Sequence, residues 1–263
     1  MNVIRMSTKK RKILVISPGP YDMWDASEKK YYRKYLPDNY QVDFTFTEFG
    51  SDNVESYYDK AITTPYMLEK ILEGEKNGYD AIIIACYDDP GVEAAREIVE
   101  IPVIGPGEAS LHIASMLGFN ISIVSPGIGG GMKRGKCKQK FEIEKHERIG
   151  LSRRITSIRG IGLDCSEIDK ESLERLFSLL LTEGKKAVEE DLADVLVLGC
   201  SGLKRFAEKL QEKLGVPVID PLVAALKMAE VLVDMNLHQS KIVYSKPRDI
   251  PRKYPPSLKR RIY

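Results

Sequence analysis

KILVISPG at residues 12–19 returns as NISIVSPG at residues 120–127, and this repeat decides the fold. The two copies continue in the same order, with YDAIIIACYDDPG (79–91) matched by ADVLVLGCSGL (193–203), and IPVIGPGEAS (101–110) matched by VPVIDPLVAA (216–225). A duplicated unit of this length predicts two similar halves, and ligand pockets favour the interface between such halves. Each copy carries one cysteine at the matching place, Cys86 and Cys200.

Short β-branched runs alternate with longer stretches of helical period along the chain. A run such as AIIIA (81–85) is apolar at every position, which is typical of a strand covered by helices on both faces. The alternation predicts an α/β protein with two similar lobes, each a mainly parallel sheet flanked by helices, related by internal duplication. We expect a first lobe over 1–110 that 222–245 completes, a second lobe over 111–221, and a C-terminal tail over 246–263.

The same patterns predict where the elements lie. We expect strands at 12–17, 41–47, 81–85 and 103–104, and in the second half at 121–125, 154–158, 195–198 and 218–219. We expect helices at 65–77, 92–100, 108–117, 170–190, 204–214 and 222–235. Both cysteines then lie just past the end of a strand, which is where parallel sheets bind their ligands.

Charge and hydropathy exclude several classes of partner. With 40 Lys and Arg against 38 Asp and Glu, the net charge of +2 gives no electrostatic attraction for nucleic acid or an anionic membrane. No apolar stretch approaches the roughly 20 residues of a membrane span, and the N-terminus lacks the apolar region of a signal peptide. We expect a cytoplasmic protein that acts on a small molecule and binds neither nucleic acid nor membrane. A homo-oligomer is left open.

The cysteine pattern does not favour metal binding or a structural disulfide. The four cysteines form no CxxC pair and have no histidine at ligand spacing, so no metal site is expected. In a reducing compartment structural disulfides are rare. Cys137, in the Gly- and Lys-rich stretch 127–140, and Cys165 are interpreted as incidental.

The turns after the two matching cysteines predict reactive thiols. Asp89 followed by Pro90 fits an N-cap with proline at the first helical position, and Ser201 fits the cap of the helix after Cys200. A thiol beside a helix N-terminus has its pKa lowered from about 8.5, because free N–H groups and the helix dipole favour anions. The competing interpretation is that each cysteine is a small buried core residue. Because the two cysteines occupy matching turns, we favour a functional role for them over a core role.

These motifs resemble the aspartate/glutamate/hydantoin racemase superfamily. The resemblance rests on CYDDPG, IPVIGPGEAS, GCSGL and VPVIDP, runs over about 12–234, and is strongest to the hydantoin racemase branch, whose tail is similar to QSKIVYSKPRDIPRKYPPS (239–257). It implies a cofactor-independent racemase that inverts a carbon α to a carbonyl. Cys86 and Cys200 would be two bases, one on each face of that carbon, which exchange roles with the handedness of the substrate. A hydantoin or an amino-acid-like substrate is implied.

The same turns predict the substrate-binding residues. These are Ser17, Pro18, Gly19, Tyr87, Asp88, Ser125, Ser201 and Gly202. Hydantoin racemases commonly carry an Asn-Pro-Asn-Thr-like turn where this chain has Ser-Pro-Gly-Pro at 17–20, so the substrate is open. Amino-acid racemases of the superfamily place Asn-Thr and Thr-His after their cysteines. The Tyr-Asp and Ser-Gly found here favour a neutral or ring-shaped substrate over free glutamate.

Two other functions remain open at this point. One is a bilobed small-molecule binding protein without turnover, and the other is a single-cysteine isomerase or decarboxylase of the same superfamily. The adjacent carboxylates Asp88 and Asp89 are interpreted as turn residues rather than an acid/base pair, and His112 as a packed core residue. The glycines at 127–131 lack the ending of a phosphate-binding P-loop, and are interpreted as a possible lid. The basic tail is interpreted as a surface strap or subunit contact.

Overall fold

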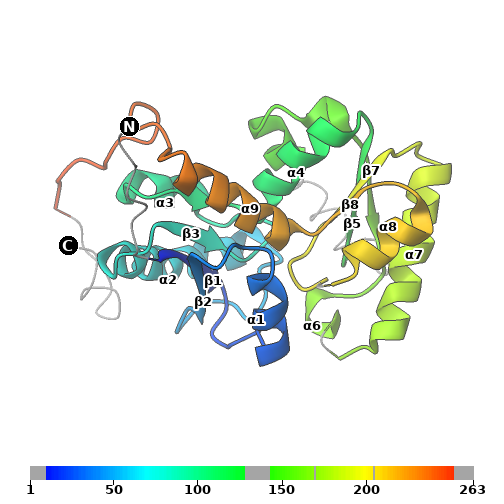
Figure 1. The fold of residues 1–263 in the computed structure, drawn as a ribbon, viewed down its shortest axis with the longest axis horizontal. Coiled ribbons are helices and arrows are strands. Elements are labelled where there is room, and N and C mark those ends of the chain that lie inside the picture. Colours follow the sequence, from blue (N-terminus) through cyan, green and yellow to red (C-terminus); the bar gives the residue numbers. More distant parts are fainter. Residues whose placement is uncertain (1–9, 128–142, 169, 204, 252–263) are drawn as a thin grey trace, which may run out of the picture.

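The computed structural model describes residues 10–127, 143–168, 170–203 and 205–251, and its two halves lie side by side (Figure 1). The first sheet contains β1 (Arg11–Ser17), β2 (Tyr40–Phe46), β3 (Ala81–Ile84) and β4 (Val103–Ile104). The second contains β5 (Ile121–Ser125), β6 (Ile155–Gly160), β7 (Val195–Leu198) and β8 (Val218–Ile219). Both sheets are parallel, with strand orders β2-β1-β3-β4 and β6-β5-β7-β8. The predicted α/β fold with two similar lobes is confirmed.

The helices cover both faces of each sheet. They are α1 (Ala26–Arg33), α2 (Tyr57–Lys76), α3 (Val92–Ile98), α4 (Pro106–Leu117), α6 (Cys165–Ile168), α7 (Leu173–Glu189), α8 (Ala207–Leu214) and α9 (Pro221–Asp234). A 3₁₀ turn spans Ser152–Arg154, and residues 143–148 are also helical. No helix among the described residues is long and apolar enough to cross a membrane.

The helices α4 and α9 exchange between the halves. Helix α4 follows β4 of the first sheet but contacts β7 of the second, whereas α9 follows β8 of the second sheet and packs on β3 and β4 of the first. The two helices also pack against each other, and α9 runs through the middle of the molecule in Figure 1. The expected boundary between the lobes, between residues 110 and 111, falls inside the continuous helix α4.

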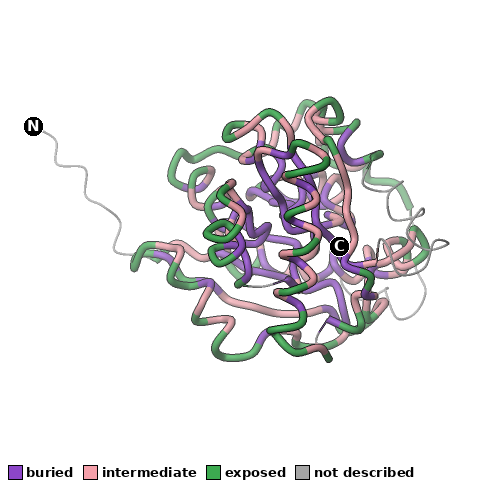
Figure 2. Tube along the Cα trace, turned by 90° about the vertical axis from the view of Figure 1, so that its right-hand side faces the viewer, coloured by how far each residue is buried: buried purple, intermediate pink, exposed green. Residues whose placement is uncertain are grey.

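The strands divide their side chains between three apolar clusters. Ile13 and Val15 of β1 belong to a central cluster shared with both sheets, α4 and α9, whereas Leu14 and Ile16 face an outer cluster under α2 and α3. In β7, Val195 and Val197 join the central cluster and Leu196 an outer one under α7 and α8. This is the period-two alternation of a strand buried on both faces. Figure 2 shows the buried segments gathered in the interior.

Several expected details differ from the structure. Helix α2 begins at Tyr57, not at 65, because Ser56 caps it by accepting from the Asp59 N–H, and Pro65 lies inside the helix. Helix α1 was not expected, since its residues are mostly polar; it is fixed by a capping box. His112, expected in the core, is exposed on α4. Most of the glycine-rich segment with Cys137, and the end of the tail, lie outside the described residues.

Candidate active site

A cavity lies between the two halves at the carboxyl ends of β1, β3 and β7. It is lined by Ser17, Pro18, Gly19, Tyr21, Met23, Asp52, Asn53, Val54, Ala85, Cys86, Tyr87, Asp88, Cys165, Gly199, Cys200, Ser201 and Gly202. Every site residue expected from the sequence except Ser125 is in this lining. The two matching cysteines therefore open onto the same space.

Cys86 lies in a tight turn that follows the apolar strand β3. Its N–H donates to the Ile84 carbonyl at 2.7 Å, and its carbonyl accepts from the Asp89 N–H at 3.0 Å. Burial, and then the charge of Asp88, raise the pKa of the Cys86 thiol to about 12, although Lys60 acts in the opposite direction and Cys200 raises it further. The expectation that this turn lowers the pKa of Cys86 is wrong, because desolvation outweighs the local N–H groups.

Asp89 does not cap the helix that follows it. Helix α3 begins at Val92, with Gly91 as N-cap and no side-chain cap. The Asp89 carboxylate instead accepts from the N–H groups of Gly107 at 2.9 Å and Glu108 at 2.8 Å, and so caps α4. Gly105 permits this approach, because a Cβ there would lie 2.4 Å from Asp89 Cγ. The expected local cap is wrong, and a longer-range cap replaces it.

The turn after Cys200 is closed by the same kind of backbone bond as the turn after Cys86. The Gly202 N–H donates to Cys200 Sγ at 3.3 Å, and the Leu203 N–H donates to the Cys200 carbonyl at 3.1 Å. Helix α8 starts at Ala207, so Ser201 is not its cap, as the sequence had suggested. The Ser201 hydroxyl is buried and finds no hydrogen-bond partner among the described residues. A buried unsatisfied hydroxyl on a cavity wall is suited to bind a polar group of a ligand.

The serines of the two strand ends have different surroundings. The Ser17 hydroxyl accepts from Trp24 Nε1 at 2.6 Å, while Ser17 still lines the cavity. The fully buried Ser125 donates to the Gly199 carbonyl at 3.1 Å and is not in the lining. The structure does not bring Ser125 to the cavity, because the chain at Gly199 packs directly over its side chain.

Sequence patterns did not identify eight of the lining residues, of which Ala85 and Gly199 directly precede the two cysteines. Tyr21, Met23 and the segment 52–54 come from the loops after β1 and β2, where no motif marks them. Cys165, interpreted above as incidental, begins α6, and its N–H donates to Glu55 Oε1 of the first half at 3.2 Å. That bond brings the third thiol to the cavity. No local signal predicts such a contact across 110 residues.

The charge of the lining is one-sided. Asp52 and Asp88 supply carboxylates, and no lysine or arginine of the described ranges is in the lining. Across those same residues, no group of three or more His, Cys, Asp or Glu side chains is placed to hold a metal ion. The site thus presents thiols, hydroxyls, carboxylates and backbone groups.

Comparisons with known proteins identify the family of the chain. The family described as Asp/Glu/Hydantoin racemase matches residues 21–229. A hydantoin racemase from Pseudomonas sp. (strain NS671) is 38% identical over 195 residues, which cover 74% of this chain and 75% of the relative. A second hydantoin racemase, from Paenarthrobacter aurescens, is 32% identical over 242 residues, or 90% of this chain and 98% of the relative.

A solved structure extends the likeness to three dimensions. The allantoin racemase from Klebsiella pneumoniae superimposes with a TM-score of 0.83 at 28% identity, covering 95% of this chain and 99% of that one. A glutamate racemase from Francisella tularensis, with a TM-score of 0.60 and 18% identity, shares the fold. The chain belongs to the Asp/Glu/hydantoin racemase family, and it is a racemase.

Proposed function

We propose that this racemase inverts the carbon α to a carbonyl in a 5-substituted hydantoin, with Cys86 and Cys200 as its two acid/base groups. One observation carries the proposal: the two cysteines that occupy equivalent turns of the duplicated halves line a single cavity. Each also lies just past the end of a central strand of its sheet, β3 or β7. Two similar groups on opposite sides of one carbon are what inversion by proton transfer requires.

The chemistry follows from the two thiols. A thiolate on one side removes the C5 proton, so that a C–H bond breaks and an S–H bond forms. The thiol on the other side then gives its proton to the opposite face of the planar enolate, which restores a C–H bond of inverted configuration. Atoms and electrons balance without a cofactor. The raised pKa of Cys86 favours its protonated form in the resting enzyme, which suits it to donate a proton. With a substrate of the opposite handedness the two cysteines exchange roles.

The composition of the cavity favours a neutral ring. A free amino acid brings a carboxylate, which would meet Asp52 and Asp88 with no lysine or arginine from the described part of the lining. A hydantoin instead has two N–H groups, which can donate hydrogen bonds to these carboxylates, and two carbonyl groups, which can accept hydrogen bonds. The buried Ser201 hydroxyl can donate to one of those carbonyls. Backbone N–H groups of the cysteine turns would stabilise the enolate.

The experiment follows both enantiomers of a panel by circular dichroism in D₂O. The panel contains 5-alkyl, 5-aryl and 5-ureido hydantoins together with free aspartate and glutamate. We expect loss of optical activity and deuterium at C5 for the hydantoins only. Racemisation of the free amino acids alone would contradict the substrate, and binding without deuterium incorporation would indicate a protein without turnover.

The cysteines are tested by substitution. Cys86→Ser and Cys200→Ser are each expected to lower racemisation by about 10³-fold or more, because a hydroxyl is far less acidic than a thiol. Cys165→Ser is the matched control: it removes a thiol of the same cavity that has no counterpart in the repeat, and should stay within about tenfold of the wild type. If one of the first two variants keeps wild-type activity and a covalent adduct accumulates, a single-cysteine mechanism replaces this one.

A further inference from the structure

A buried lysine of the second half contacts the turn that carries Cys86. Lys145, in the helical residues 143–148, donates from Nζ to the Tyr87 carbonyl at 2.8 Å, and the same Nζ lies 3.5 Å from the centre of the Tyr87 ring. Tyr87 follows Cys86 directly and lines the cavity. The ammonium group therefore binds the backbone one residue from a reactive thiol.

The same ammonium group interacts with Asp89. A Cβ on Gly107 would lie 2.8 Å from Lys145 Nζ and 2.9 Å from Asp89 Oδ2, so both charged groups face the same small space. It would also lie 2.1 Å from the Tyr87 carbonyl oxygen, which explains why this position lacks a side chain. Lys145 lowers the pKa of Asp89, which burial raises to about 7. Lys145 and Asp89 are 7% and 3% exposed.

Burying two opposite charges costs more desolvation free energy than an apolar pair of the same volume. The cost is offset here by a set of directed contacts, since Asp89 also accepts the Gly107 and Glu108 N–H groups of α4. Lysine, aspartate and carbonyl together fix the backbone of 87–89. Asp89 needs such support, because its φ of +50° is unfavourable for a residue with a side chain.

The contact also joins the halves of the molecule. Lys145 lies in the chain between β5 and β6 of the second sheet, and β5 pairs with β7, the strand that leads to Cys200. The Cys86 turn follows β3 of the first sheet. The lysine thus ties the turn of one cysteine to the sheet that holds the other.

We propose that Lys145 is a positioning residue of the racemase: its ammonium group donates to the Tyr87 carbonyl and attracts the Asp89 carboxylate electrostatically, and so holds Cys86 in register with Cys200 across the cavity. Lys145 is not in the cavity lining, so it acts through the turn and not on the substrate. The inference rests on the proposed two-cysteine function.

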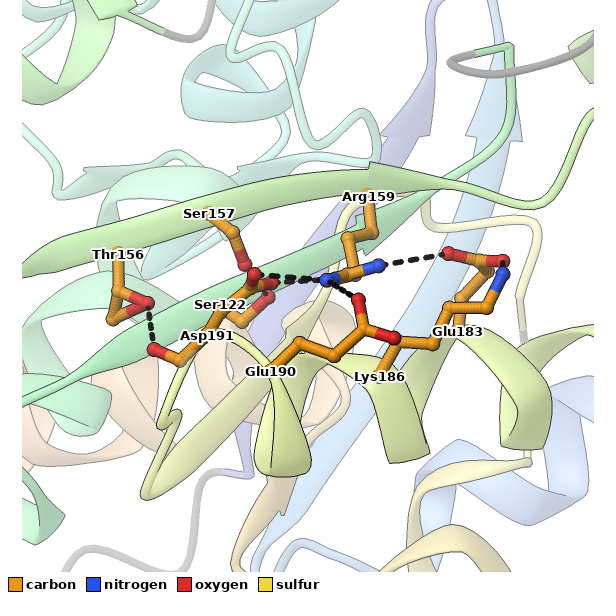
Figure 3. Close-up of polar contacts among 8 residues, drawn as sticks. All are labelled: Ser122, Thr156, Ser157, Arg159, Glu183, Lys186, Glu190 and Asp191. Carbon is orange, nitrogen blue, oxygen red and sulfur yellow. Dashed lines mark hydrogen bonds and ion pairs between the residues drawn. The ribbon is translucent and has the colours of Figure 1, made fainter.

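The test compares Lys145→Met with Arg159→Met. Methionine keeps the length of the lysine stem and removes the charge and the donor. Arg159, on the edge strand β6, is a matched control, and its side chain is 17% exposed. It donates to Glu190 and Asp191, each at 2.8 Å (Figure 3). None of these three residues lines the cavity. Both variants remove a cation of low exposure that acts on a nearby carboxylate, and only the first one changes the Cys86 turn.

We expect Lys145→Met to lower kcat for hydantoin racemisation by about 100-fold with KM within threefold, because a displaced thiol impairs proton transfer more than substrate binding. Arg159→Met should leave kcat within twofold. Equal kcat values for Lys145→Met and the wild type would overturn the proposal. A wild type that does not racemise hydantoins would instead overturn the proposed function.

A double variant separates positioning from stability. Asp89→Asn combined with Lys145→Met removes the buried carboxylate charge that the single variant leaves without its cation, while the amide oxygen can still cap α4. We expect the thermal midpoint to recover toward that of the wild type and kcat to stay at least 30-fold low, because the Lys145 donor to the Tyr87 carbonyl is still missing. Recovery of kcat together with the midpoint would show that the attraction between Lys145 and Asp89 serves stability alone, and would overturn the proposal even if Lys145→Met by itself fails to fold.

Discussion

Both cysteine turns are joined to a helix N-terminus by an aspartate, which belongs to the turn in one half and to the helix in the other. In both halves a buried aspartate joins the turn to the N-terminus of the long helix that follows the last strand. In the first half Asp89 belongs to the turn and reaches the N–H groups of α4. In the second half Asp220 is the N-cap of α9, accepts from Leu222 and Val223, and reaches back to the Arg205 N–H in the stretch after Cys200.

Asp89 and Asp220 have similar roles but different surroundings. Asp89 interacts with the Lys145 ammonium group, whereas Asp220 accepts from the neutral Tyr32 hydroxyl at 3.2 Å. Burial raises the pKa of both, to about 7 for Asp89 and about 6 for Asp220. Duplication has thus kept the contact between turn and helix but not the residue that makes it. The two turns therefore differ in the group beside their carboxylate, an ammonium group for Asp89 and a phenol for Asp220.

Alkylation tests the environment of the Cys86 turn. Because the pKa of Cys86 is raised to about 12, its thiolate fraction at pH 8 is far below that of a free thiol. Allowing for the greater nucleophilicity of the more basic thiolate, we expect iodoacetamide to modify Cys86 about 100-fold more slowly than the same residue in the urea-unfolded chain. The rate should rise about tenfold per pH unit between pH 7 and 9. Peptide mass spectrometry measures both.

The unfolded chain is the control for intrinsic reactivity, since it removes burial and the charge of Asp88 together. Folded and unfolded rates within threefold of each other would contradict a protonated Cys86. In the reverse reaction, where Cys86 is the base, its thiolate would then form without a lowering of its pKa by the bound substrate.

Exchanging the position of the carboxylate is the next test. Gly105 and Asp220 are counterparts in the repeat, and a side chain at 105 collides with Asp89. We expect Gly105→Asp to lower the free energy of unfolding by about 2 kcal/mol, because it overpacks the site and buries a second carboxylate. Adding Asp89→Gly should restore at least half of that loss in urea unfolding. The glycine also suits the positive φ of position 89.

If the double variant is no more stable than Gly105→Asp, the two capping carboxylates are not interchangeable. Asp89 would then be required for its interaction with Lys145 rather than for capping α4. Measuring kcat in the double variant distinguishes the two roles.

The sequence predicted the parts of this comparison that depend on local pattern. The apolar runs place most strands within one or two residues of their observed bounds. The repeat predicts two halves, each with a cysteine just past the end of a strand of its own sheet. It did not predict that Asp89 caps α4, because Asp-Pro-Gly fits a local N-cap and the space at Gly105 exists only in the folded chain. Lys145 was missed for the same reason, since it stands in a polar stretch with no motif. Contacts between distant segments depend on packing, which periodicity does not report.

The smallest effect concerns the partner of Asp220. Between its unfolded pKa of about 4 and its folded pKa of about 6, the folded state binds more protons than the unfolded state, so this group lowers stability as pH rises through that window. The Tyr32 hydroxyl lowers the pKa of Asp220 and so limits the loss. We expect Tyr32→Phe to reduce the free energy of unfolding by about 1–2 kcal/mol at pH 8, where the carboxylate is ionised, and by less at pH 5.

Tyr40→Phe is the matched control for this substitution. Its hydroxyl donates to Asp234 at 2.7 Å, but that carboxylate is 51% exposed, so water replaces the lost donor at little cost. Urea unfolding at the two pH values should therefore show a pH-dependent difference for Tyr32→Phe and a small, constant one for Tyr40→Phe. An equal loss at pH 5 and pH 8 for Tyr32→Phe would mean that the second half does not depend on the ionised form of its capping carboxylate. The contrast with the lysine-bound Asp89 would then be one of partner alone and not of charge.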